Sequence, residues 1–78
     1  MHVDRYTKIF ADRLAKKMNE KGISLTELSR KSDIAHPVIL RYLAGKSFPN
    51  VWRIANLAHA LECTTDELCG VGEIVVDW

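Results

Sequence analysis

The sequence predicts an all-α fold: a compact five-helix bundle that contains a helix-turn-helix, followed by a short extended arm or strand at the C-terminus. Three observations predict it. Apolar residues recur at three- and four-residue steps, N-capping residues precede three of these segments, and two short helical segments between residues 24 and 49 are joined by a four-residue turn. With 78 residues, 47% of them hydrophobic, the chain suits one domain with a single small core.

The first helix is expected over residues 5–20, because its apolar residues lie one helical turn apart with Lys and Arg between them. Gly22 follows as the residue that ends it. Its inward positions are Tyr6, Ile9, Phe10, Leu14 and Met18. This amphipathic helix is expected to form the floor of the core.

The second helix begins at Ser24, whose hydroxyl can accept a hydrogen bond from a backbone N–H of the first turn. Glu27 stands three residues later, which is the spacing of a capping box. Asp33 tolerates the left-handed backbone that ends a helix, and Ile34 follows as an apolar plug between two helices. The chain is therefore predicted to turn after this helix.

The third helix is expected over about residues 36–44, since Pro37 suits a first helical turn and Gly45 ends the segment. A helix this short is held by packing rather than by its own stability. Ile39 and Tyr42 are expected to face inward, with Val38 partly inward. The opposite face is the candidate reading face, and it consists of His36, Pro37, Leu40, Arg41 and Ala44.

Two further helices complete the bundle. Asn50 can cap a fourth helix, and Thr64 with Glu67 repeats the capping-box spacing at the start of a short fifth helix that ends at Gly70. The inward positions of the fourth helix are Ile54, Leu57, Ala58 and Leu61. Residues 1–70 are thus expected to form the helix-turn-helix domain.

Residues 71–78 have a different character, because Ile74, Val75 and Val76 are adjacent β-branched residues after Gly72. They predict an extended arm or strand. Such a strand either pairs with its copy in a dimer or lies across the bundle. Disorder of the last residues is the remaining interpretation.

Charge is divided unevenly along the chain. All 11 Lys and Arg lie in residues 1–53 together with five acidic residues, a net charge of +6, whereas residues 54–78 hold the other five acidic residues and neither Lys nor Arg. A basic part that meets phosphate and an acidic part kept away from it would explain this division. Scattered charge on helical surfaces is the plainer interpretation.

Other kinds of chemistry have little support. Cys63 and Cys69, with His59 nearby, fit no common zinc spacing, so we expect no metal, and both cysteines are interpreted as small buried residues near Leu61 and Leu68. No catalytic constellation or phosphate-binding glycine loop is visible, so neither enzymatic activity nor a cofactor is expected. No signal peptide or membrane span is apparent, which predicts a cytoplasmic protein.

Residues 23–68 resemble the Cro and lambda-repressor-like helix-turn-helix family, also called the xenobiotic-response-element family of bacterial and phage regulators. The resemblance covers about three fifths of the chain. It is carried by residues 24–29 as helix two, the Ile34 plug, the Ile39 anchor, Gly45, Lys46 and Pro49 after helix three, then Ile54, Leu57, Ala58, Leu61 and the run Thr64, Thr65, Asp66, Glu67 and Leu68.

Three positions depart from the family pattern. Leu25 stands where the family usually has a Gln, Asp33 at the usual turn Gly, and Leu43 where the family often has a Glu. In the family that Gln touches phosphate and braces the recognition helix. Leu25 therefore leaves that phosphate contact without its usual side chain, with no effect on the fold.

The resemblance implies a sequence-specific regulator of transcription that binds double-stranded DNA, in most cases a repressor that acts as a homodimer in a prophage, mobile element or bacterial operon. With the third helix in the major groove, Arg41 can bind guanine or phosphate, and His36 can donate to a base edge or phosphate. Leu40 and Ala44 can pack on thymine methyl groups. The family's phosphate contacts correspond to Thr26, Lys46, Ser47 and Asn50.

Several alternatives stay open at this stage. Arg41 can be a solvated surface charge and His36 a simple capping residue. Phe48 and Trp52 are interpreted as cover for the core or as interface contacts, rather than as base-stacking platforms. A protein-interaction module on the same fold, or an antitoxin-like protein that binds a protein partner through its C-terminal arm, is the alternative function.

Overall fold

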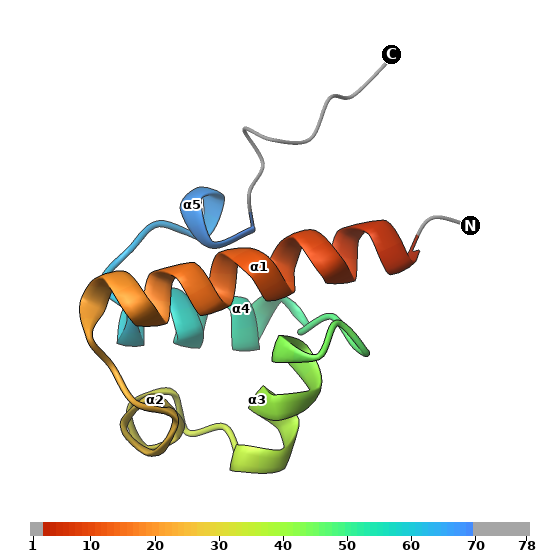
Figure 1. The fold of residues 1–78 in the computed structure, drawn as a ribbon. Coiled ribbons are helices and arrows are strands. Elements are labelled where there is room, and N and C mark those ends of the chain that lie inside the picture. The colour runs from red at the N-terminus through yellow and green to blue at the C-terminus, as the bar shows by residue number, and fades with distance from the viewer. Residues whose placement is uncertain (1–2, 70–78) are drawn as a thin grey trace.

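The computed structural model describes residues 3–69, which form five helices (Figure 1). The helices are α1 (Val3–Lys21), α2 (Leu25–Ser32), α3 (His36–Leu43), α4 (Val51–Ala60) and α5 (Thr65–Cys69). The predicted all-α bundle with a helix-turn-helix is thereby confirmed. The predicted arm over residues 71–78 and the expected end of α5 at Gly70 lie outside the described residues.

The long helix α1 lies between α5 on one side and α2 and α3 on the other (Figure 1). Helix α4 packs against both α2 and α5, so every helix contributes to one core. The largest fully buried hydrophobic side chains in the described chain are Phe10, Leu14, Leu28, Ile39, Leu57, Leu61 and Leu68. These seven residues come from all five helices or their immediate ends, and their burial supplies most of the stabilisation.

The inner face of α1 differs from the prediction at its first turn. Tyr6 is 44% exposed, whereas Thr7 and Ala11 are buried. A Cβ atom built on Gly45 would lie 3.9 Å from the Thr7 carbonyl oxygen, so the chain after α3 passes close to this part of α1. Small residues permit that approach, and the apolar stripe therefore centres on Thr7, Phe10, Ala11 and Leu14, with Tyr6 at its margin.

The C-terminus of α3 is closed by a Schellman motif. The Lys46 N–H donates to the Arg41 carbonyl at 3.0 Å, and the Gly45 N–H donates to the Tyr42 carbonyl at 3.0 Å. Gly45 has the left-handed φ of +71° that this motif requires. The predicted role of Gly45 as the end of the third helix is confirmed.

Helix α4 ends in the same motif without a glycine. The Cys63 N–H donates to the Ala58 carbonyl at 3.0 Å and the Glu62 N–H to the His59 carbonyl at 3.1 Å. Glu62 occupies the left-handed position, with φ +52°. A residue with a Cβ is strained by about 1–2 kcal/mol in this conformation. The sequence pattern gave no indication of this strain.

Replacing this strained residue is expected to stabilise the domain. Glu62→Gly should raise the free energy of unfolding by about 0.5–1 kcal/mol, because relief of the strain exceeds the entropy that glycine adds to the unfolded chain. Gly45→Ala should lower it by about 1 kcal/mol, since the added Cβ has room but the φ is unfavourable. Urea unfolding measures both. Glu62→Gln keeps the Cβ and serves as the control, so an equal gain from Gln would contradict strain as the cause.

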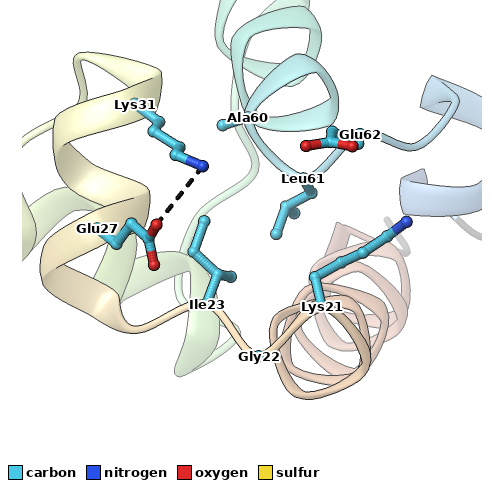
Figure 2. Close-up of a pocket in the computed structure, with 8 residues that line it drawn as sticks. All are labelled: Lys21, Gly22, Ile23, Glu27, Lys31, Ala60, Leu61 and Glu62. Atoms are coloured by element: carbon cyan, nitrogen blue, oxygen red, sulfur yellow. Dashed lines mark ion pairs between the residues drawn. The ribbon is translucent and has the colours of Figure 1, made fainter.

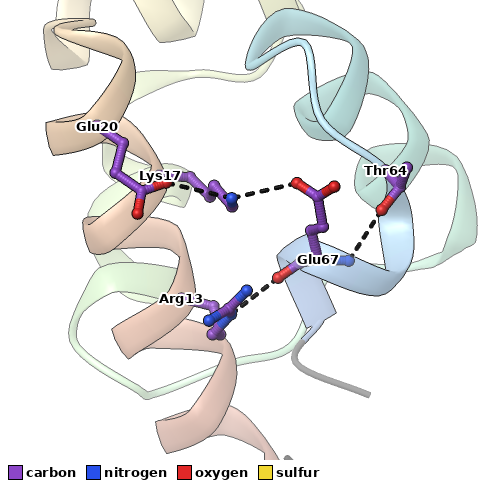
Figure 3. A network of polar contacts seen from close by, with 5 residues as sticks. All are labelled: Arg13, Lys17, Glu20, Thr64 and Glu67. Atoms are coloured by element: carbon purple, nitrogen blue, oxygen red, sulfur yellow. Dashed lines mark hydrogen bonds and ion pairs between the residues drawn. The ribbon is translucent and has the colours of Figure 1, made fainter. Parts of the chain in front are cut away.

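A polar network attaches the short helix α5 to α1 (Figure 3). The Arg13 Nε donates to the Glu67 carbonyl at 2.8 Å, and the Lys17 ammonium contacts the carboxylates of Glu67 at 3.1 Å and Glu20 at 3.2 Å. Hydrogen bonds to Glu67 and Glu20 raise the pKa of Lys17, and the bond from Lys17 lowers the pKa of Glu20. Thr64 caps α5 by accepting the Glu67 N–H at 3.1 Å. Basic residues of α1 are thus partly neutralised by the acidic C-terminal part of the chain.

Candidate nucleic-acid interface

The turn between α2 and α3 is fixed by local hydrogen bonds and one buried side chain. The Ser24 hydroxyl accepts the Glu27 N–H at 3.1 Å, so the predicted N-cap is confirmed. Asp33 adopts the left-handed conformation with φ 60°, and Ile34 is 4% exposed. The Ser29 hydroxyl donates to the Ile34 carbonyl at 2.6 Å, which ties the turn back to α2. The two helices are therefore held at a defined angle.

Helix α3 is anchored on its inner side at both ends. Its N-cap, Ala35, makes no side-chain capping bond, so Pro37 in the first turn and packing determine where the helix starts. Ile39 is fully buried and Tyr42 is 2% exposed. Both inward residues were predicted correctly.

Tyr42 connects α3 to two other helices. Its ring packs edge-on against Phe10 of α1, with ring centroids 6.0 Å apart and an interplanar angle of 79°. Its hydroxyl oxygen accepts a hydrogen bond from Arg53 Nη1 of α4 at 3.2 Å. This Tyr42–Arg53 bond was not predicted from the sequence, because the two residues meet only once α3 and α4 have packed.

The outer side of α3 is open to solvent. All five candidate reading residues are exposed, and they are His36, Pro37, Leu40, Arg41 and Ala44. Leu40 exposes 51% of its surface. Among residues 3–69, the Arg41 guanidinium has neither a hydrogen-bond partner nor an ion-pair partner. The face thus combines one long, unpaired donor with small apolar surfaces.

Three of the four candidate phosphate-binding residues lie together in the segment between α3 and α4. Lys46 and Asn50 are exposed and Ser47 is half-buried. Asn50 caps α4 by accepting the Arg53 N–H on its Oδ1 at 2.9 Å, which leaves its amide NH₂ to donate elsewhere. Thr26 is exposed in the first turn of α2, and Figure 1 shows α2 on the other side of α3 from the segment that joins α3 to α4. The four residues therefore flank the reading face from both sides.

Two of the departures from the family pattern have a structural explanation. Leu25 and Leu43 are half-buried and pack against the core. Each replaces a polar family residue with additional apolar contact, which suits a small domain in which every buried methylene contributes. Asp33 adopts the left-handed conformation for which glycine is the usual residue.

The cysteines require one correction, and the structure separates the two interpretations given for Phe48 and Trp52. Cys63 and Cys69 are half-buried and not fully buried, and desolvation raises the pKa of both thiols, which keeps them protonated. Phe48 does cover the core, since its ring centroid lies 5.2 Å from that of Phe10. Trp52, in contrast, is 78% exposed and does not cover the core. The described part of the chain contains no group of three or more potential metal ligands.

A shallow hollow lies between the C-terminal ends of α1 and α4 and one side of α2 (Figure 2). Its polar lining consists of Lys21, Glu27, Lys31 and Glu62, and the Glu27 carboxylate pairs with the Lys31 ammonium at 3.5 Å. Two lysines and two glutamates leave the hollow without net charge. It contains none of the candidate reading or phosphate-binding residues.

Comparison with known proteins identifies the family. A family model for the Cro/C1-type HTH DNA-binding domain matches residues 13–72, which is well over half of the chain. No curated protein and no solved structure gives a significant match. No helix within residues 3–69 combines the length and apolar character needed to cross a bilayer. With its helix-turn-helix geometry and this match, the chain belongs to the Cro/C1-type helix-turn-helix family of DNA-binding regulators.

Proposed function

We propose that the protein is a sequence-specific transcriptional repressor that binds double-stranded DNA as a homodimer, with α3 in the major groove. The observation that carries this proposal is the division of α3 into two faces. Ile39 and Tyr42 fix the helix to the bundle, while Arg41 and its exposed neighbours remain unpaired among the described residues. A short helix with a rigid inner side and a free outer side is suited to reading base edges.

The reading residues would divide the recognition between them. Arg41 would make a bidentate contact with guanine O6 and N7, and His36 at the start of α3 would donate to a base edge or a phosphate. Leu40, Ala44 and Pro37 have no side-chain donors, so they would pack on thymine methyl groups and sugar edges. The expected DNA site therefore contains a G·C pair, with thymine methyl groups at neighbouring positions.

Phosphate contacts would fix the register of the domain on the duplex. Lys46, Ser47 and Asn50 would hold one strand beside α3, and Thr26 with the N-terminal backbone amides of α2 would hold the other. Two copies would read half-sites about one helical turn, roughly 34 Å, apart on a two-fold operator. Repression would follow from occupancy of a promoter in the cytoplasm of a bacterium, in an operon, prophage or mobile element.

Selection of bound fragments from random DNA, followed by titration at several salt concentrations, tests this proposal. The selected sequences are expected to contain a two-fold repeat, and the affinity is expected to fall about 1,000-fold between 50 and 200 mM salt, since six or more phosphates would be contacted. Selection without a consensus would contradict sequence-specific regulation. If the chain instead binds another protein, and the affinity of that binding hardly changes with salt concentration, the domain is a protein-interaction module.

A further inference from the structure

Three large hydrophobic side chains are exposed together where the segment after α3 enters α4. Phe48 is 42% exposed, Val51 75% and Trp52 78%. We call these three residues the apolar edge. Val51 and Trp52 are the two most exposed large hydrophobic residues of the described chain. Single exposed apolar residues are common, but three within five consecutive residues, one of them a nearly free tryptophan, are typical of an interface.

The core does not require Trp52 at this position. Helix α4 buries Leu57 and Ala58, whereas Trp52 shares its face with Asn56 and His59, one and two turns later, and both are exposed. A tryptophan on an otherwise polar stripe exposes a large apolar surface without stabilising the monomer. Some contact outside residues 3–69 is therefore the physical reason to place it there.

The position of the apolar edge selects its partner. Helix α2 and the segment that carries the apolar edge lie on opposite sides of α3 (Figure 1). Every exposed residue from 24 to 33 is polar, so the α2 side offers no apolar contact. When two copies place α3 in successive major grooves, one side of each α3 faces the dyad axis of the DNA. The side that can form an apolar contact is the one that carries Trp52.

We propose that the apolar edge is the contact between two copies of this chain on adjacent half-sites, an inference that rests on the proposed function. The contact surface is small, since Val51 and Trp52 of two copies can bury roughly 600 Å² in total. A stable interface buries about 1,200–2,000 Å². The apolar edge therefore forms a weak contact that develops on DNA and makes the second copy bind more tightly than the first.

The charges beside the apolar edge favour this contact between two copies on DNA over the same contact in free solution. Lys46 and Arg53 are exposed next to it, so two copies that meet here bring like charges together. The DNA phosphates between the copies offset this repulsion, and without DNA it opposes association. The same residues that draw each copy to DNA thus limit dimer formation in free solution.

Binding to DNA with two half-sites and to DNA with one half-site, both taken from the selected operator, tests this inference. Trp52→Ala is expected to lower the affinity for the two-half-site DNA at least about tenfold, while binding to the single half-site stays unchanged. His59→Ala, at the other exposed end of the same helical stripe, is the matched control and should leave both affinities unchanged. Because Trp52 is so exposed, the variant is expected to fold normally, which circular dichroism checks.

A second measurement uses the fluorescence of Trp52 in a Trp78→Phe variant, in which it is the remaining tryptophan. Its emission is expected to shift to the blue on the two-half-site DNA but not on the single half-site, as the indole leaves water only when a second copy is present. If Trp52→Ala binds the two half-sites with the cooperativity of the wild type, and if the emission of Trp52 does not shift on the two-half-site DNA, the proposed contact is overturned. The proposed function would remain intact. Failure of the wild type to bind any selected DNA would overturn both.

Discussion

Replacing Arg41 with alanine is expected to lower the affinity for the selected operator about 10- to 100-fold, while affinity for random-sequence DNA changes no more than about threefold. The guanidinium projects from the exposed face of α3 and has no partner among the described residues, so no intramolecular contact is lost with it. A bidentate contact with guanine contributes about 1–3 kcal/mol of discrimination, and this contribution exists only at the correct base.

Lys46→Ala provides the comparison for this variant. Lys46 is an exposed cation in the segment after α3, and a phosphate contact there is independent of base sequence. Its loss is expected to lower the affinities for operator and for random DNA by similar factors. It should also reduce the slope of log affinity against log salt concentration by about 1 per copy. Binding isotherms over a salt series measure both quantities. If Arg41→Ala behaves in the same way as Lys46→Ala, Arg41 contacts phosphate and does not read a base.

Truncation of Ile39 is expected to have the largest effect on stability. This side chain is fully buried on the inner side of α3, so Ile39→Ala leaves a cavity and should lower the free energy of unfolding by about 2–5 kcal/mol. The total free energy of unfolding of a domain of this size is about 4–12 kcal/mol. The expected fall in Tm is about 15 °C, which differential scanning calorimetry measures directly.

Two control variants locate the origin of that loss. Ile39→Val removes one methylene and is expected to cost about 0.5–1.5 kcal/mol. Leu40→Ala, on the adjacent exposed position of the same helix, should change the free energy of unfolding by less than about 1 kcal/mol. If Leu40→Ala were as destabilising as Ile39→Ala, α3 would not be divided into a buried and an exposed face.

The local chemistry of the sequence was sufficient to predict the helix-turn-helix. Ser24 and Asn50 act through hydrogen bonds to residues three positions away, and Gly45 acts through its own backbone conformation, so neighbouring residues determine their roles. The two faces of α3 follow from the helical period, which is why Ile39 and Leu40 were assigned to opposite sides correctly.

Features that depend on distant packing were not predictable in this way. Tyr6 is exposed while Thr7, which lies close to the chain at Gly45, is buried, and the Tyr42–Arg53 bond forms between different helices. The exposure of Trp52 depends on which side of α4 meets the core, and large apolar side chains are buried on average. The roles of the reading and phosphate-binding residues depend on DNA, so they stay predictions.

The attachment of Tyr42 to both Phe10 and Arg53 has a thermodynamic consequence for recognition. Because α1 and α4 hold α3 in place, α3 would enter the groove in a preformed shape if the proposed function is correct. Little conformational entropy would then be lost on docking, and the heat-capacity change of complex formation would reflect mainly the surface dehydrated at the contact. Selectivity would come from how well a rigid shape matches a given stretch of duplex.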